Sequence, residues 1–276
     1  MSTTASLRDI AGNLVLVGAG KMGAAILDGW AARSVDLHRV VVFEPQPSLQ
    51  VSRYVPQGLR LNPERKGLNA AAIVVAVKPQ AAAEVLPSLA STVEPATVVI
   101  SIMAGRTLAA LQGALPAGTA IVRTMPNTPA AVGRGITVAV ANAKVTPAQR
   151  QLAERLLGAT GVVEWISDET LMDAVTAVSG SGPAYVFLLT EYLARAGVAA
   201  GLPADLAEKL ARVTVAGSGE LMHLSPDDAA TLRKNVTSPG GTTAAALDVL
   251  MAGGGLEPLL KAAVAAATRR SRELGS

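Results

Sequence analysis

Three glycines near the start of the chain, Gly18, Gly20 and Gly23, have the spacing of a dinucleotide-binding turn. They follow the apolar run 14–17 and lead into an alanine-rich segment, which predicts a strand, a tight turn and a helix. In such a turn the first glycine permits the bend, the second admits a pyrophosphate, and the third lets the helix pack closely on the strand. Free N–H groups at the helix start then face the phosphates. The pattern alone is weak, because ordinary turns between packed elements also contain it.

A second apolar run, 40–43, ends at Glu44. Dinucleotide-binding folds carry a ribose-binding acid about 20 residues after the glycines, which is where this glutamate lies. A carboxylate there accepts hydrogen bonds from the adenosine ribose and repels a 2′-phosphate, so Glu44 favours NADH over NADPH. Two alternatives stay open: a solvated glutamate at a strand end, and a 2′-phosphate bound by Arg53 or Arg65.

Three later loops, 77–80, 101–105 and 125–129, also follow predicted strands. Because the carboxyl ends of parallel strands meet at one edge of a sheet, these loops can hold the nicotinamide half of the cofactor. Asn127 and Thr128 offer polar side chains there. The simpler alternatives are a solvated lysine at the strand end for Lys78 and, for Asn127, a side chain that satisfies its own turn.

Two stretches in the second half of the chain, 179–185 and 235–243, are rich in hydroxyl groups and glycine. Both read as helix entries. A helix start of this kind offers unpaired N–H groups and hydroxyls without a competing anion, which suits a small carboxylate. Ordinary helix capping is the competing explanation.

The elements that must position these residues divide the chain in two. Up to residue 167 strand-like and helix-like segments alternate, which predicts an α/β, doubly wound (Rossmann-type) dinucleotide-binding domain over 1–167. Over 168–276 the pattern predicts an all-α domain that binds substrate and forms a dimer, because its helices are apolar on more than one face. The expected strands are 14–17, 40–43, 71–77, 97–102, 120–123, 135–140 and 161–165. The expected helices include 80–89, 107–115, 147–157, 182–197, one from Pro203 to about 223, one opened by Ser225 and Pro226, and 256–274.

Composition excludes several kinds of chemistry. The chain of 276 residues has no cysteine, so disulfides and thiolate catalysis are impossible. Its two histidines, His38 and His223, lie far apart in sequence, and no metal site is expected. The charge of +3, from 24 basic and 21 acidic residues, gives little support to nucleic-acid binding. No apolar run is long enough to span a membrane and no secretory pattern opens the chain, so a cytoplasmic protein is expected.

From Gly12 to Leu274 the chain resembles pyrroline-5-carboxylate reductase. The motifs that carry the resemblance are 17–23, 76–79, 125–129 and 179–185, in the order of that family, and most specifically 235–243. The resemblance implies reduction of 1-pyrroline-5-carboxylate to L-proline by NADH or NADPH, in a homodimer or a decamer of dimers. It also implies that each active site receives elements of both subunits.

The resemblance further implies roles for individual residues. Thr243 would hydrogen-bond the ring nitrogen, as the catalytic group. The residues implied to bind substrate are Val236, Ser238, Gly241, Thr242 and Thr243. The residues expected to bind the cofactor, from the glycine turn, Glu44, the strand ends and the resemblance together, are Gly18, Ala19, Gly20, Lys21, Met22, Gly23, Glu44, Ala76, Val77, Lys78, Pro79, Met103, Ala104, Asn127 and Asn235.

A hydroxyl is chemically sufficient, because a protonated imine is already electrophilic and needs positioning more than a strong acid. Two features depart from the family pattern. Glu44 stands where many members carry a residue suited to the NADPH phosphate, and Pro226 stands where some carry an acid. Two other functions stay open: a different imine or hydroxyacid oxidoreductase with a helical second domain, and a dinucleotide-sensing scaffold without chemistry.

Overall fold

The computed structural model describes residues 7–275 and divides the chain into two compact units. The first unit contains the chain up to Gly180 and again from Thr268, and the second is Ser181–Ala267. The expected boundary after residue 167 therefore precedes the point where the compact units separate. The last turns of the chain belong to the first unit.

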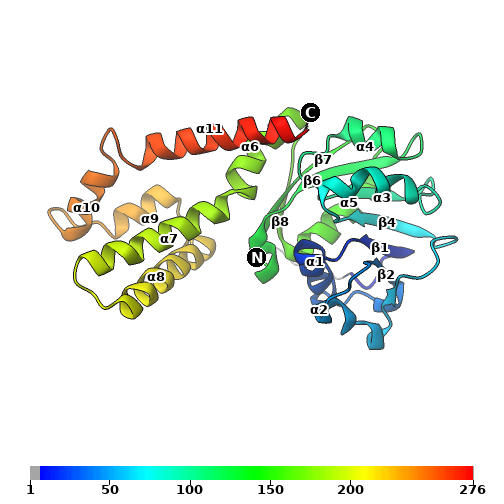
Figure 1. Cartoon of the computed structure of the whole chain (residues 1–276), viewed down its shortest axis with the longest axis horizontal. Helices are drawn as coiled ribbons and strands as arrows, with labels where there is room; N and C mark the ends of the chain where they lie inside the picture. Colours follow the sequence, from blue (N-terminus) through cyan, green and yellow to red (C-terminus); the bar gives the residue numbers. More distant parts are fainter. Residues whose placement is uncertain (1–6, 276) are drawn as a thin grey trace. The chain divides into compact units, whose positions relative to one another are not determined.

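The first unit is built on one sheet of eight strands, ordered β3-β2-β1-β4-β5-β6-β7-β8 (Figure 1). All the predicted strands form. Their bounds are β1 Asn13–Val17, β2 Val40–Phe43, β3 Arg60–Leu61, β4 Ala70–Val75, β5 Val98–Ser101, β6 Ala120–Met125, β7 Gly135–Ala141 and β8 Gly161–Trp165.

One pairing departs from the purely parallel sheet of a doubly wound fold. β7 runs antiparallel to β6, whereas the other neighbouring strands are parallel. Only a short 3₁₀ turn, Thr128–Val132, lies between β6 and β7. A parallel return needs a crossover of a dozen or more residues, so this short connection forces the strand to reverse.

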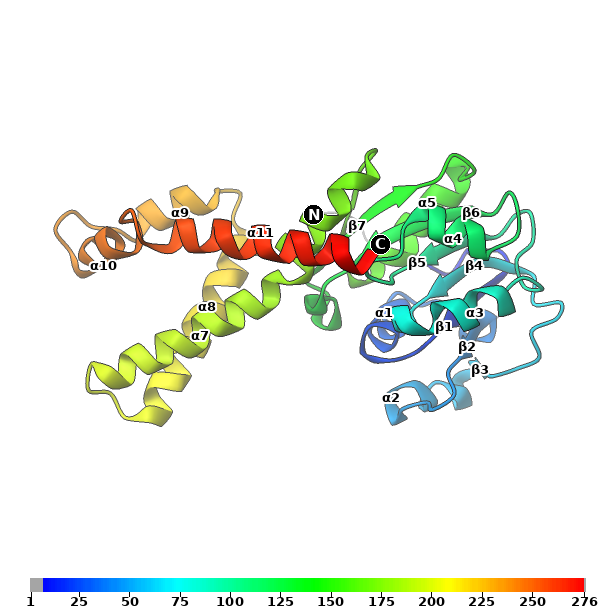
Figure 2. The ribbon, with the colours of Figure 1, turned by 45° about the horizontal axis from the view of Figure 1, so that its top comes forward.

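Helices cover both faces of the sheet (Figures 1 and 2). Side chains of α1 and α5 pack with one apolar cluster and those of α3 and α4 with another, and alternate residues of β1 point into each. Trp30 of α1 is fully buried and its indole N–H donates to the carbonyl of Leu156 over 3.0 Å. The helices of this unit are α1 Lys21–Ala32, α2 Leu49–Ser52, α3 Ala82–Ser88, α4 Leu108–Ala114, α5 Pro147–Leu157 and α6 Met172–Val175.

The second unit is helical. Its elements are α7 Gly182–Ala199, α8 Ala204–Leu224, α9 Ala229–Asn235, α10 Thr242–Leu250 and α11, which runs Leu256–Gly275 and ends in the first unit. α7 and α8 form a hairpin and pack side by side, with Gly197 close to Ala207 (Figures 1 and 2). Among the described residues, no helix is long and apolar enough to cross a membrane.

The predicted helix opening at Ser225 and Pro226 is wrong. α9 begins at Ala229, and the carboxylate of Asp228 caps it by accepting the N–H of Thr231 over 2.7 Å. The Ser225 hydroxyl instead accepts the N–H of Asp227 within the preceding turn. Since both serine and aspartate are good N-caps, the pattern alone could not distinguish the two starts.

The last turn of α11 is attached to the first unit by polar contacts. The Ser271 hydroxyl donates to the carboxylate of Asp173 over 2.7 Å, and Arg272 lies 3.8 Å from the same group. A Cβ added to Gly105 would lie 3.1 Å from the Leu274 carbonyl. The end of the chain therefore packs against the loop that follows β5.

Candidate cofactor site

A cavity of about 540 Å³ lies at the carboxyl ends of β1, β4, β5 and β6, entirely within the first unit. This volume is typical of small-molecule sites. The lining residues expected from the sequence are Gly20, Lys21, Met22, Ala76, Val77, Lys78, Pro79, Met103, Ala104 and Asn127. The four predicted loops therefore meet around one hollow.

The glycine turn has the geometry of an anion-binding helix start. Gly18 has φ +88°, and a Cβ there would lie 2.8 Å from the backbone of Ala76, so only glycine fits. Gly20 caps α1 without a side-chain hydrogen bond, and a Cβ there would meet nothing within 4 Å. A Cβ on Gly23 would collide with the carbonyl of Gly18. The open space over Gly20 and the free end of α1 fit a pyrophosphate.

Glu44 lies beside this turn. Its carboxylate accepts the N–H of Ala19 over 2.7 Å and that of Gln46 over 3.1 Å. Asn62 holds the backbone of Glu44 from the other side, because its amide accepts the Glu44 N–H and donates to the Glu44 carbonyl, both over 2.9 Å. The glutamate is therefore fixed next to the glycine turn, although it is not among the residues that line the cavity.

The two arginines considered for a 2′-phosphate have protein partners. Arg53 pairs with Asp28 over 2.8 Å and also contacts Tyr54. Arg65 stacks on the Phe43 ring, 4.5 Å from its centroid, and donates to the Ser88 hydroxyl over 2.8 Å. Since Phe43 directly precedes Glu44, the Arg65 guanidinium packs on the residue next to this glutamate.

Two polar contacts hold the loops that form the opposite wall. Arg106 donates to the carbonyl of Pro79 over 2.8 Å and so ties the loop after β5 to the loop after β4. The Asn127 side chain accepts the N–H of Ile136 over 2.9 Å. The side-chain oxygen of Asn127 therefore hydrogen-bonds the backbone near its own turn, which agrees with the alternative that Asn127 has a structural role.

The charges around the cavity suit an anionic ligand. Lys21 and Lys78 are among its lining residues, and no carboxylate is, within the part of the chain that the structure describes. The described residues contain no group of three or more His, Cys, Asp or Glu that could hold a metal ion. At the rim of the first unit, hydrogen bonds from the Thr170 hydroxyl and N–H lower the pKa of the Asp168 carboxyl.

The residues expected to bind substrate belong to the second unit. Gly241 caps α10 without a side-chain hydrogen bond, and the backbone turns sharply before it, with Gly240 at φ +68°. Val236 is 65% exposed. The first N–H groups of α10 have no partner within the helix, so the turn offers donors for a carboxylate. Asn235 ends α9 next to this turn and is not a lining residue of the cavity.

Two families of known proteins match most of this chain. Residues 169–274 match the pyrroline-5-carboxylate reductase dimerisation family, and residues 13–105 match a family described as NADP oxidoreductase, coenzyme F420-dependent. The pyrroline-5-carboxylate reductase of Pseudomonas aeruginosa is 38% identical over 95% of this chain and 96% of its own length. That of Synechocystis sp. is 43% identical over 95% of this chain and 98% of its own length.

The chain belongs to the pyrroline-5-carboxylate reductase family. Its fold agrees with solved structures of this family. A pyrroline-5-carboxylate reductase from Coxiella burnetii superposes with a TM-score of 0.88 at 35% identity and covers 97% of this chain and 100% of its own. The Plasmodium falciparum enzyme, solved with NADP bound, gives a TM-score of 0.80 at 31% identity and covers 96% of this chain and 99% of its own.

Gly180, which the sequence places in a helix entry suited to a small carboxylate, contributes to the wall of the cavity instead. Gly180 lines the cavity and lies against Met125, because a Cβ on Gly180 would overlap the methyl of that methionine. It ends a π-helical turn, Thr176–Gly180, which joins α6 to α7. Such turns are frequent at functional sites. The other lining residues outside the expected cofactor set are Ile102, Met125, Pro126 and Thr128, all within the predicted loops.

The stretch 179–185 contains the predicted helix entry, because α7 begins at Gly182. The chain passes from α6 through the π turn almost directly into α7. The Ser179 hydroxyl donates to the carbonyl of Val175 over 3.0 Å, so it satisfies the helix backbone. The lack of a side chain at Gly180 permits the close contact with Met125, but nothing in this stretch of the sequence identifies Met125 as its neighbour.

Proposed function

We propose that this protein reduces 1-pyrroline-5-carboxylate to L-proline with hydride from NADH or NADPH, as the last step of proline biosynthesis. The observation that carries the proposal is the cavity over Gly20, where four strand-end loops converge on the free start of α1. The substrate is proposed on the basis of membership in the pyrroline-5-carboxylate reductase family. In this proposal residues 1–167 bind the cofactor and residues 168–276 bind the substrate and form the dimer, whereas the compact units separate after Gly180.

The cofactor would be held mainly by the first unit. Gly18, Ala19, Gly20 and the start of α1 suit the pyrophosphate, and Lys21 lies at the same helix start. The loops containing Val77, Lys78, Met103 and Ala104 form an apolar slot suited to the nicotinamide half. Asn235 is proposed to contact the cofactor ribose from the second unit.

The substrate would be held by the turn before α10. Ser238, Gly241 and Thr242, with the nearby unpaired N–H groups at the start of α10, bind its carboxylate, and Val236 packs against the rings. Thr243 hydrogen-bonds the ring nitrogen. The cofactor supplies a hydride to the carbon of the protonated C=N bond, and the nitrogen retains its proton as the π electrons become its lone pair. Thr243 therefore orients the imine while the carbon is reduced.

We infer that NADH is the preferred cofactor. The Glu44 carboxylate lies beside the glycine turn and is held there by Asn62, so a 2′-phosphate would approach a negative charge. The Plasmodium falciparum relative was solved with NADP bound, and Arg65 stacks on Phe43, the residue before Glu44, where its positive charge would favour a phosphate. Repulsion of the 2′-phosphate by the Glu44 carboxylate supports the preference for NADH.

The active form is proposed to be a homodimer, with a decamer of dimers as the larger assembly, in the cytoplasm. The match to the dimerisation family over 169–274 supports self-association. The exposed apolar side chains of α7 support the same conclusion, because large exposed apolar patches mark interaction surfaces.

The deciding experiment follows the loss of nicotinamide absorbance with NADH and NADPH separately, with pyrroline-5-carboxylate as substrate. Turnover with chromatographically identified proline as product is expected. A second set of assays uses open-chain imines with reduced cofactor and 2-hydroxyacids with oxidised cofactor. Faster turnover of these substrates than of pyrroline-5-carboxylate would indicate a different oxidoreductase. Dinucleotide binding without oxidation of either cofactor in any arm would indicate a sensing scaffold.

A further inference from the structure

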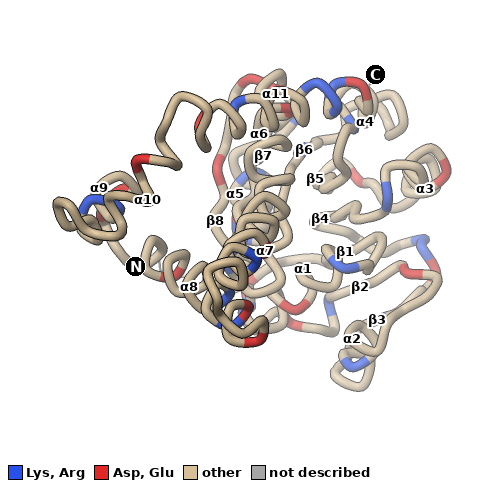
Figure 3. Tube along the Cα trace, turned by 60° about the vertical axis from the view of Figure 1, so that its left-hand side comes forward, with Lys and Arg blue, Asp and Glu red and all other residues tan. Residues whose placement is uncertain are grey.

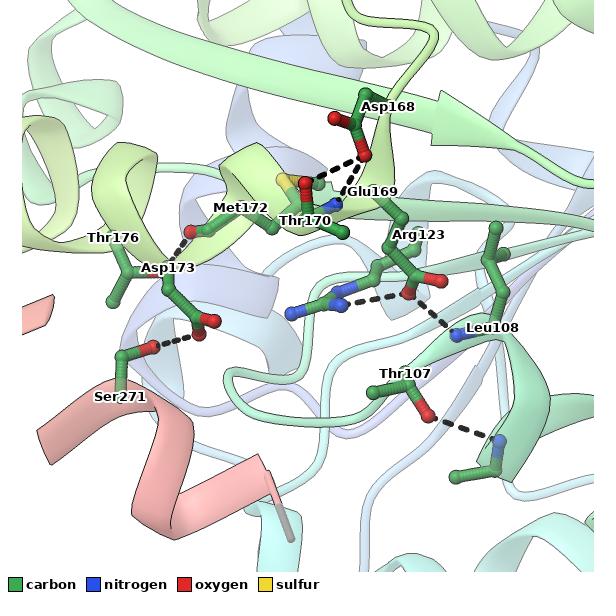
Figure 4. Close-up of polar contacts among 11 residues, drawn as sticks. Thr107, Leu108, Arg123, Asp168, Glu169, Thr170, Met172, Asp173, Thr176 and Ser271 are labelled. Atoms are coloured by element: carbon green, nitrogen blue, oxygen red, sulfur yellow. Dashed lines mark hydrogen bonds and ion pairs between the residues drawn. The ribbon is translucent and has the colours of Figure 1, made fainter. Parts of the chain in front are cut away.

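A partly buried ion pair joins β6 to the segment that follows β8. The guanidinium of Arg123 contacts the carboxylate of Glu169 over 2.7 Å (Figure 4). The Arg123 side chain is only 8% exposed and that of Glu169 is 29% exposed. Removing Glu169 would leave the Arg123 charge shielded from water and without this partner, which makes the pair more consequential than a fully exposed ion pair.

The same carboxylate oxygen has a second partner. It accepts the backbone N–H of Leu108, the first residue of α4, over 2.7 Å (Figure 4). The loop 102–107 runs directly into this helix, and its residues Ile102, Met103 and Ala104 line the cavity. Glu169 therefore fixes the end of a loop whose other end forms a cavity wall.

The pair also connects the two other nearby walls. Arg123 lies two residues before Met125 on β6, so both side chains point to the same face of the strand. Glu169 begins the segment that passes through α6 and ends at Gly180, where the glycine lies against Met125. The ion pair and the Leu108 hydrogen bond thus join the start of α4, β6 and the start of the segment that leads through α6 to the π-helical turn.

Neither side chain is among the residues that line the cavity, so the pair does not touch the cofactor itself. We propose that Arg123 and Glu169 form a positioning pair, which holds Met103, Ala104 and Met125 at the separation that the nicotinamide ring needs for hydride transfer. This inference rests on the proposed function, because it assigns the nicotinamide to this cavity. Supporting contacts of this kind keep reactive groups within the narrow range of productive geometry.

The test compares Glu169→Gln and Arg123→Lys with wild type. Glutamine keeps an acceptor for the Leu108 N–H and removes the charge, whereas lysine keeps the charge and removes the planar fork. We expect kcat per folded active site to fall about tenfold in Glu169→Gln, since a misplacement of about 1 Å can cost up to a hundredfold. Arg123→Lys should lie between this variant and wild type.

Two readouts separate positioning from a purely structural role. With cofactor deuterated at the transferred position, the kinetic isotope effect on kcat should rise in Glu169→Gln, because a misaligned hydride step becomes rate-limiting. Asp28→Asn is the matched control, since it removes the charge from the Asp28–Arg53 pair, which lies in the same unit and outside the cavity lining. It should leave kcat and the isotope effect unchanged.

Wild-type kcat and isotope effect in both folded variants would overturn the proposal. If Glu169→Gln does not fold, Arg123→Lys decides alone by the same two measurements. Failure of the proposed function is recognised separately. If wild-type protein oxidises neither NADH nor NADPH, the proposed reaction is wrong. If a Gly20→Val variant binds the cofactor with unchanged affinity, the cavity is not the cofactor site.

Discussion

The two units bury their apolar residues very differently, as α1 and α7 illustrate. α1 has 12 residues, and six of them are buried, including Ile26, Leu27 and Trp30. α7 has 18 residues and none is buried, although most of them are apolar. The charged residues of α7 are Glu191 and Arg195, which pair with each other. Figure 3 marks Lys and Arg in blue and Asp and Glu in red along the trace of the chain. The first unit therefore has a core of its own, whereas the second presents unpaired apolar surface.

This difference indicates where each part of the site obtains its rigidity. The glycine turn is fixed within a single chain by the sheet, by α1 and by Glu44. The turn 236–241 is mostly exposed at the start of α10, which also buries no residue. Burying a large apolar side chain contributes about 1.5–3 kcal/mol, so self-association that covers the exposed apolar side chains of this unit would stabilise it. The substrate turn is expected to depend on the partner subunit for its order.

The largest effect is expected from Phe187→Glu. Phe187 is 66% exposed on α7, and a charge there would disrupt an apolar interface. Loss of about 2–4 kcal/mol, typical of a central interface residue, would weaken self-association roughly 30- to 1000-fold. Light scattering after gel filtration should then show a monomer with little activity. Leu49→Glu, at a 90% exposed leucine of the first unit, is the control and should remain associated. An unchanged oligomer in Phe187→Glu would contradict the interface.

Thr243→Ala should lower kcat for imine reduction by about one to two decades, because losing one hydrogen bond to the reacting nitrogen costs roughly 1–3 kcal/mol. The Michaelis constant for the cofactor should change much less. Steady-state rates at saturating substrate and varied cofactor concentration measure both quantities. Thr243→Ser retains the hydroxyl and should preserve most of the activity. Full activity in the alanine variant would remove this role from Thr243.

Gly20→Val should weaken dinucleotide binding by about tenfold or more, because the new side chain would occupy the space that a pyrophosphate needs. The fold should tolerate it, since a Cβ at Gly20 meets nothing within 4 Å and φ is −64°. Titration calorimetry gives the dissociation constant. Gly113→Ala in α4, which also has open space and lies outside the cavity lining, should bind normally. If the two variants bind the dinucleotide with equal affinity, the cofactor does not bind at this turn.

The smallest effect is expected from Glu44→Ser. Like charges near solvent repel by about 1 kcal/mol at close range, so wild type should prefer NADH about fivefold and the variant should narrow or reverse this preference. Specificity constants for both cofactors measure it. Glu64→Ser, at an exposed carboxylate outside the turn, should leave the ratio unchanged. A wild-type preference for NADPH of about tenfold or more would make Glu44 an ordinary strand-end residue.

The local architecture of the first unit could be predicted from the sequence. Continuous β-branched runs such as 71–77 predict strands buried on both faces, and β4 forms there. A helix is expected over 147–157, and α5 spans those residues with a complete capping box at Thr146. The glycine spacing predicted the turn over α1. These signals are local, because backbone preference and periodicity act within a few residues.

Contacts between distant segments were decided by the tertiary structure alone. Arg123 and Glu169 are 46 residues apart, and the residues around each of them in the sequence do not predict that they form an ion pair. The contact of Gly180 with Met125 and the attachment of Ser271 to Asp173 are likewise long-range. The reversal of β7 followed from the short turn before it, but its place at β6 depended on the sheet as a whole. Such contacts depend on how the packed elements bring surfaces together, and no periodicity within one segment encodes them.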